Sequence, residues 1–186
     1  MVAVLTSILC SCGVSAVNND TEQSKTMKEY QLNRFLGSDE EMEAFMEDAL
    51  VNDFCSNIYL NEEETIMTVV ATDEQRDKWI EVAIKNIEDA VKDVSAADEY
   101  SVDLNTEYTE CVIRASGNRN MKAMAQTSMK ILMQAEIYQV FSGIEDWSVN
   151  YTIIDSDIDK EILNVDFPKE DIDFSANMWR NDIEPQ

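Results

Sequence analysis

Three aspartates at alternate positions form the clearest candidate for metal chemistry in the chain. Asp155, Asp157 and Asp159 give the pattern D-x-D-x-D, which opens the loop of EF-hand calcium sites. That loop also needs glycine at its sixth position and glutamate at its twelfth, and here those positions hold Lys160 and Asp166. A hairpin turn explains the same residues, because aspartate and serine stabilise turns through bonds to nearby backbone. The pattern favours a polar turn, with calcium as the alternative.

Cysteine is the second residue type that could do chemistry. Cys55 and Cys111 lie in the part of the chain expected to fold, and they could form a disulfide in an oxidising compartment. Cys111 lies on the apolar side of an alternating pattern, which favours a buried free thiol. The chain has no histidine, so Ser-His-Asp and Cys-His catalysis are excluded. We therefore expect no enzymatic activity, no catalytic residue and no cofactor other than the calcium alternative. A hydrolase that uses carboxylates would need two of them held across a cleft, and nothing in the sequence indicates such a pair.

Four methionines crowd one predicted helix, at positions Met121, Met124, Met129 and Met133. Methionine-rich faces can form adaptable binding surfaces. At helical spacing in a small domain they are more typical of core packing, which is the interpretation we favour.

The start of the chain is apolar. Residues 1–19 carry no charged side chain, and residues 2–9 include the apolar run Val2-Ala3-Val4-Leu5 and Ile8-Leu9. A membrane-spanning helix needs about 20 apolar residues, so this run is too short to cross a bilayer. Its length is typical of the core of a signal peptide.

The residues that follow are Leu9-Cys10-Ser11-Cys12-Gly13. This stretch resembles the lipobox of bacterial lipoprotein signal peptides: an aliphatic residue, a variable one, a small one, then cysteine. The resemblance implies that Cys12 is lipidated and becomes the first residue of the mature protein. It departs from the pattern in one feature, because no Lys or Arg precedes Lys25. A start upstream of the given methionine would supply such residues.

Two other interpretations of this segment stay open. Ordinary signal-peptidase cleavage after residues 14–16 would release a freely secreted protein. Alternatively, residues 2–9 form a core strand of a cytosolic protein.

The elements that must position these residues follow from hydrophobic periodicity and capping signals. The chain alternates between helical and strand patterns before it ends in a hairpin. The predicted elements are a helix over 38–55, a strand over 65–71, a helix from Thr72 to Val94, a strand over 108–115, a helix over 120–142, and strands over 147–153 and 163–167.

This order, α-β-α-β-α-β-β, predicts an α+β fold with two layers: about three helices on one four-stranded sheet. The predicted segments are a signal peptide over 1–11, the lipidated cysteine with a polar tether over 12–37, an α/β domain over 38–168, and a C-terminal tail over 169–186. The folded part resembles no family that we recognise.

Charge limits the partners. The formal net charge is −24, and such a surface repels nucleic-acid phosphates. We expect a non-enzymatic surface lipoprotein, held to the outer face of the cell membrane by its lipid, that binds a small ligand or another cell-envelope component. The alternative is a cytosolic acidic inhibitor, such as a DNA mimic or immunity-type protein, whose carboxylates meet a basic partner.

Overall fold

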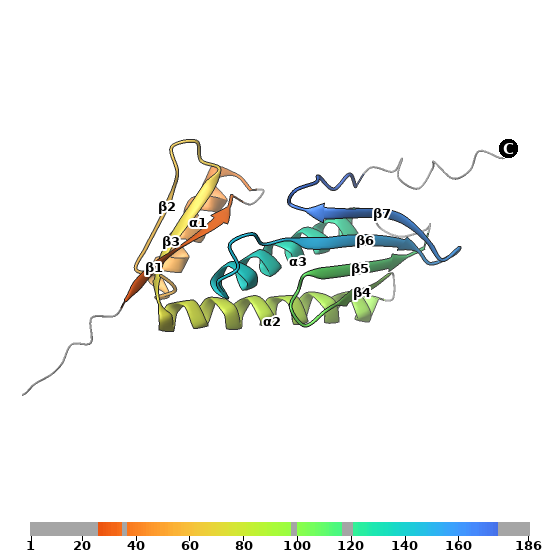
Figure 1. Cartoon of the computed structure of the whole chain (residues 1–186), viewed down its shortest axis with the longest axis horizontal. Helices are drawn as coiled ribbons and strands as arrows, with labels where there is room; N and C mark the ends of the chain where they lie inside the picture. The colour runs from red at the N-terminus through yellow and green to blue at the C-terminus, as the bar shows by residue number, and fades with distance from the viewer. Residues whose placement is uncertain (1–25, 35–36, 98–99, 117–120, 175–186) are drawn as a thin grey trace, which may run out of the picture.

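The computed structural model describes residues 26–34, 37–97, 100–116 and 121–174. Within these ranges the chain forms three helices and seven strands in two sheets (Figure 1). In chain order the elements are β1 (Met27–Asn33), α1 (Asp39–Val51), β2 (Asn57–Leu60), β3 (Ile66–Thr72), α2 (Asp73–Ala97), β4 (Tyr100–Leu104), β5 (Glu110–Ala115), α3 (Met121–Phe141), β6 (Val149–Asp155) and β7 (Lys160–Phe167).

The first sheet is antiparallel and has the order β1-β3-β2. Its central strand β3 is rich in β-branched residues and mostly buried, as a strand paired on both sides must be. Helix α1 lies beside this sheet, and Met42 and Ala49 are its buried residues.

The second sheet is mixed and has the order β4-β5-β6-β7. Strands β5 and β6 are parallel and are joined through α3, whereas β4-β5 and β6-β7 are antiparallel pairs. The inward-facing residues of β6, Val149, Tyr151 and Ile153, are fully or almost fully buried.

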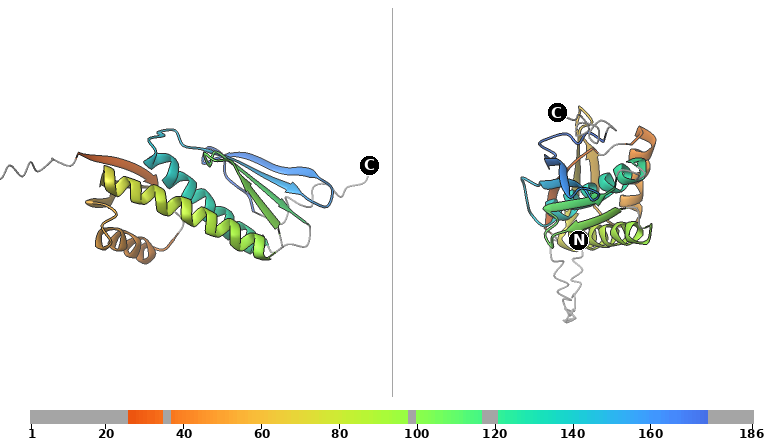
Figure 2. Two further views of the ribbon diagram at one scale, coloured as in Figure 1. Left: turned by 90° about the horizontal axis from the view of Figure 1, so that it is seen from below. Right: turned by 90° about the vertical axis from the view of Figure 1, so that its right-hand side faces the viewer.

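Helices α2 and α3 pack against each other and run along both sheets, as Figure 2 shows. One core cluster lies between the four-stranded sheet and these two helices. A second cluster joins the three-stranded sheet, α1 and the other ends of α2 and α3. In the second cluster Phe141 stacks between Tyr30 and Trp79, with ring centroids 4.4 and 5.2 Å away. The helix pair therefore sets the position of one sheet relative to the other.

Capping residues fix where the helices begin and end. Ser38 and Glu41 form a reciprocal capping box at α1. Thr72 and Gln75 do the same at α2, through bonds of 3.0 and 3.3 Å. Gly143 has φ +92° after α3, and the backbone N–H groups of Gly143 and Ile144 bond back to Val140 and Gln139, which is a Schellman motif.

The structure confirms three of the sequence-based expectations: the α+β class, the three helices and the closing hairpin. The prediction of one sheet is wrong, because the strands form two sheets, and the four-stranded one contains different strands from those expected. Strand β3 was expected in it, but β3 pairs with β1 and β2 in a separate sheet, and β4 occupies the edge beside β5. Strands β1, β2 and β4 were not predicted. All three are edge strands with one solvent-facing side, so they carry few apolar residues.

The folded part extends beyond the range of 38–168 predicted for the domain, at both ends. Strand β1 lies inside the range expected to be a polar tether, so that part of the range belongs to the fold. Ile172 and Phe174, in the predicted tail, pack against the larger core cluster. The predicted signal peptide and Cys12 lie outside the described residues.

Candidate functional site

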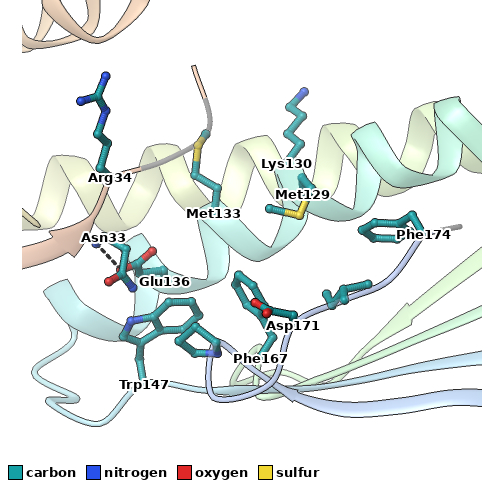
Figure 3. Close-up of a pocket in the computed structure, with 12 residues that line it drawn as sticks. Asn33, Arg34, Met129, Lys130, Met133, Glu136, Trp147, Phe167, Asp171 and Phe174 are labelled. Carbon is teal, nitrogen blue, oxygen red and sulfur yellow. Dashed lines mark hydrogen bonds between the residues drawn. The ribbon is translucent and has the colours of Figure 1, made fainter. Parts of the chain in front are cut away.

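A pocket of about 610 Å³ lies where the two sheets approach α3. Its lining comes from the end of β1, the middle of α3, the loop before β6, the end of β7 and the segment after β7 (Figure 3). Ligand pockets of small molecules fall in the range of about 300–1,000 Å³. The pocket therefore has the size of a small-molecule site and is assembled from segments far apart in the sequence.

Most of the lining is apolar. Met129 and Met133 from α3 form one wall, and Trp147 and Phe167 form the opposite wall, with ring centroids 5.8 Å apart. Phe174 extends the aromatic part, and its ring lies 6.1 Å from the ring of Tyr151.

Glu136, on α3, is the buried acid of the pocket lining. It is 1 % exposed. It lies three residues after Met133, so helical spacing places both on one face. One carboxylate oxygen accepts hydrogen bonds from the backbone N–H of Asn33 at 2.7 Å and from its side-chain amide at 3.0 Å. The polar edge of the Trp147 indole lies near the carboxylate (Figure 3) and favours its charged form. Asn33, the last residue of β1, is thereby joined to α3 and to the loop before β6.

The electrostatics of Glu136 follow from its burial. Desolvation raises the pKa of its carboxyl group from 4.5 to about 7, although the hydrogen bonds from Asn33 and the nearby polar edge of Trp147 act in the opposite direction. Near neutral pH the group is therefore divided between its charged and neutral forms. In the described part of the chain, no salt bridge involves Glu136.

Three other charged residues line the pocket: Arg34, Lys130 and Asp171. Arg34 is ion-paired with Asp39 and with Glu64, the latter at 3.2 Å. Figure 3 shows the charged ends of Arg34 and Lys130 directed away from the Glu136 carboxylate. The basic groups are therefore at the rim, and the acid is inside.

Buried polar contacts hold α3 and the start of β6 in place. The Gln139 side chain donates to the backbone oxygens of Tyr108 and Ser148 and accepts from the N–H of Ser148 at 3.2 Å. Ser148 follows Trp147, so these bonds fix the backbone next to the pocket. The hydroxyls of Ser128 and Tyr151 bond at 2.7 Å and join α3 to β6 farther along.

The aspartates of the predicted calcium pattern lie at the β6-β7 turn, away from this pocket. Asp155 accepts a bond from the backbone N–H of Asp157 at 2.9 Å, and Asp159 pairs with Arg114 at 3.2 Å. Among the residues that the structure describes, no group of three His, Cys, Asp or Glu side chains could hold a metal ion. The arrangement is that of a turn with an ion pair.

The two candidate disulfide cysteines lie apart. Cys55 belongs to the cluster of the three-stranded sheet, and Cys111 belongs to that of the four-stranded sheet. Both are buried free thiols, so the structure does not contain the pairing. Burial raises the pKa of both thiols, that of Cys111 to about 12. Both thiols are therefore protonated and poorly nucleophilic near neutral pH.

The structure shows core packing for three of the four methionines of α3. Met124 is fully buried, Met121 and Met129 pack against the same core cluster, and Met129 also lines the pocket together with Met133. Glu136 and Asn33 were not recognised as site residues from the sequence. A signal for Glu136 was present, because it is an acid between Ala135 and Ile137 on the most apolar helix.

Comparisons with protein-family models, curated proteins and solved structures found no match to this chain. Within the described ranges, none of the helices combines the length and apolar character needed to cross a membrane.

Proposed function

We propose that this protein is a non-enzymatic binding protein, anchored by lipid to the outer face of a bacterial membrane, whose pocket takes a small ligand with an apolar body. The observation that carries the proposal is the pocket itself. A volume of about 610 Å³, mostly apolar walls and a buried acid in the lining are features of small-molecule sites.

The residue types at the pocket support binding rather than catalysis. Among the residues that the structure describes, its lining contains neither cysteine, serine, threonine nor tyrosine, and the whole chain has no histidine. Glu136 and Asp171 are its carboxylates, and Asp171 is exposed whereas Glu136 is held by Asn33 and Trp147. This geometry supports a role for Glu136 in recognition rather than in catalysis.

The anchor rests on the sequence alone. The stretch Leu9-Cys10-Ser11-Cys12 resembles a lipobox, and a lipid on Cys12 would leave the folded part on the outer face of the membrane. Single-lipid anchoring is marginal, but the diacylglyceryl group of a lipoprotein provides more than one chain.

Binding is tested with the neutral apolar probe N-phenyl-1-naphthylamine, whose fluorescence rises in apolar sites. We expect the full chain to enhance the signal in a saturable way. Met133→Trp should weaken probe binding by about tenfold, or about 1.4 kcal/mol, because the larger side chain fills the cavity. Met27→Trp is the matched control, because Met27 is 56 % exposed on β1 and does not line the pocket.

Equal binding by the native chain and both variants would place the probe elsewhere, and absence of any saturable signal would reject the ligand-binding role. Circular dichroism of each variant establishes that the fold is retained.

The anchor is tested separately by the intact mass of the protein from the membrane fraction of a bacterial host. We expect the native chain and Cys10→Ala to lack residues 1–11 and to carry a diacylglyceryl adduct. Cys12→Ala should keep residues 1–11 and carry no adduct. An unprocessed chain in the soluble fraction would contradict the anchor. It would direct the search to the alternative, an acidic cytosolic inhibitor with a basic partner, which the net charge of −24 supports.

A further inference from the structure

Building on the proposed binding function, we propose that the ligand is a primary organic ammonium ion, whose charged nitrogen pairs with Glu136 and whose apolar body lies between the methionine and aromatic walls. Four observations lead to this class of ligand.

The first is a buried carboxyl group that has no charged partner among the described residues. Glu136 is 1 % exposed, and the groups next to it, Asn33 and Trp147, are neutral. Burying a charge is costly unless an opposite charge accompanies it. Asn33 occupies one carboxylate oxygen with both of its bonds. A ligand with an N⁺–H group would supply the missing positive charge and a charge-assisted hydrogen bond.

The second is the aromatic wall next to this carboxylate. The polar edge of the Trp147 indole is turned towards Glu136 (Figure 3), and its ring packs edge to face with Phe167. Aromatic faces attract cations, and tryptophan does so most strongly. The ring face, which is the part that attracts a cation, would therefore be contacted by the carbon atoms next to the ammonium group, whereas the carboxylate would bind the ammonium group itself.

The third is the charge around the pocket. Arg34 is engaged by Asp39 and Glu64, and Lys130 is directed away from Glu136 (Figure 3). Asp171 adds a second acid to the lining. The net charge of −24 also favours the approach of cations over anions.

The fourth is the size and shape of the apolar part. Met129, Met133 and Ile172 extend the lining away from Glu136 along α3 and the segment after β7. This arrangement gives one charged end and one apolar end. A ligand with a single cationic head and a hydrocarbon or aryl body matches both.

The test uses isothermal titration calorimetry of the full chain with three probes of similar size: 2-phenylethylammonium, 2-phenylethanol and 3-phenylpropanoate. At pH 8 we expect the ammonium probe to bind at least about tenfold more tightly than the alcohol, and the carboxylate to bind most weakly. Glu136→Gln should remove the preference for the ammonium probe over the alcohol. The matched control Glu107→Gln removes one charge from an exposed position outside the pocket and should keep the preference.

A second measurement uses the native chain only, so it holds even if Glu136→Gln fails to fold. The pKa of Glu136 is about 7, and the other charged groups lining the pocket are Arg34, Lys130 and Asp171. The ammonium probe should pair with the ionised carboxylate, whose population falls about tenfold from pH 8 to pH 6. Its affinity should fall by about the same factor, and that of the alcohol should not.

Equal affinity for the ammonium and alcohol probes, preference for the carboxylate, or a preference that survives in Glu136→Gln would overturn the inference. If N-phenyl-1-naphthylamine still binds in the pocket, only the ligand class is wrong. If no probe binds, the proposed function fails as well.

Discussion

Glu136 shows how a single residue combines a structural cost with a chemical role. Its carboxylate is buried, yet it joins β1 to α3 through Asn33 and contacts Trp147. The sequence marks this residue as unusual, because an acid interrupts the most apolar helix. It does not reveal the partners, because Asn33 lies 103 positions away and the pairing depends on how β1 packs against α3.

The raised pKa of Glu136 predicts a pH dependence of stability. The folded-state pKa of about 7 lies above the value of 4.5 expected in the unfolded chain, so the folded state binds the proton more tightly. The stabilisation of the folded state by protonated Glu136 is fully present below pH 4.5 and is lost as the pH rises through 7. Relative to Glu136→Gln, the native protein should lose about 2–3 kcal/mol of unfolding free energy between pH 5 and pH 8.

Urea denaturation of both proteins at pH 5 and pH 8 measures this difference, and other titrating groups cancel in the comparison. A stability gap that stays constant between the two pH values would contradict a buried carboxyl group with a raised pKa. A gap that changes in the opposite direction would indicate that the ionised form is the one stabilised by folding.

At the scale of elements, capping and periodicity were reliable guides. Capping boxes at Ser38 and Thr72 lie at the starts of two of the predicted helices, and the left-handed Gly143 directly follows the end of the third. The strands that the sequence did not indicate are β1, β2 and β4. In β2 only Ile58 is buried, and in β4 only Val102. Such strands form because a neighbour offers backbone hydrogen bonds, and this information is not local.

Gly143 predicts a stability effect of backbone origin. Its φ of +92° is one that alanine adopts only with strain, and a Cβ at this position would meet no atom within 4 Å. Gly143→Ala should therefore lower the free energy of unfolding by about 1–2 kcal/mol. Gly37→Ala is the control, because Gly37 is not among the described residues with a positive φ. An added Cβ there would lie 3.3 Å from the end of the flexible, exposed Glu41 side chain, which can shift, so its effect should be smaller.

Chemical denaturation of both glycine variants gives the comparison. An equal loss in the two variants would show that the Schellman motif after α3 contributes no more than an ordinary surface turn.

At the scale of the whole molecule, the pocket results from the way two sheets share one helix pair. The three-stranded sheet contributes Asn33 and Arg34, and the four-stranded sheet with its flanking segments contributes Trp147 and Phe167. The sequence predicted one sheet, and with a single sheet there is no junction and no such pocket. The candidate site therefore could not be derived before the fold was known, although its apolar methionines were noticed.

The tryptophan side chains offer the most direct test of ligand binding at this pocket. The chain has three tryptophans. The indole of Trp147 lies in the pocket, whereas that of Trp79 donates to the backbone oxygen of Phe54 at 2.8 Å in the core of the other cluster. Their indole N–H resonances in a ¹H–¹⁵N NMR spectrum are assigned with Trp147→Phe and Trp79→Phe. Titration with N-phenyl-1-naphthylamine should shift the Trp147 signal in a saturable way and leave the Trp79 signal in place. An unmoved Trp147 signal at probe saturation, or equal shifts of both signals, would contradict a binding site at the junction of the two sheets.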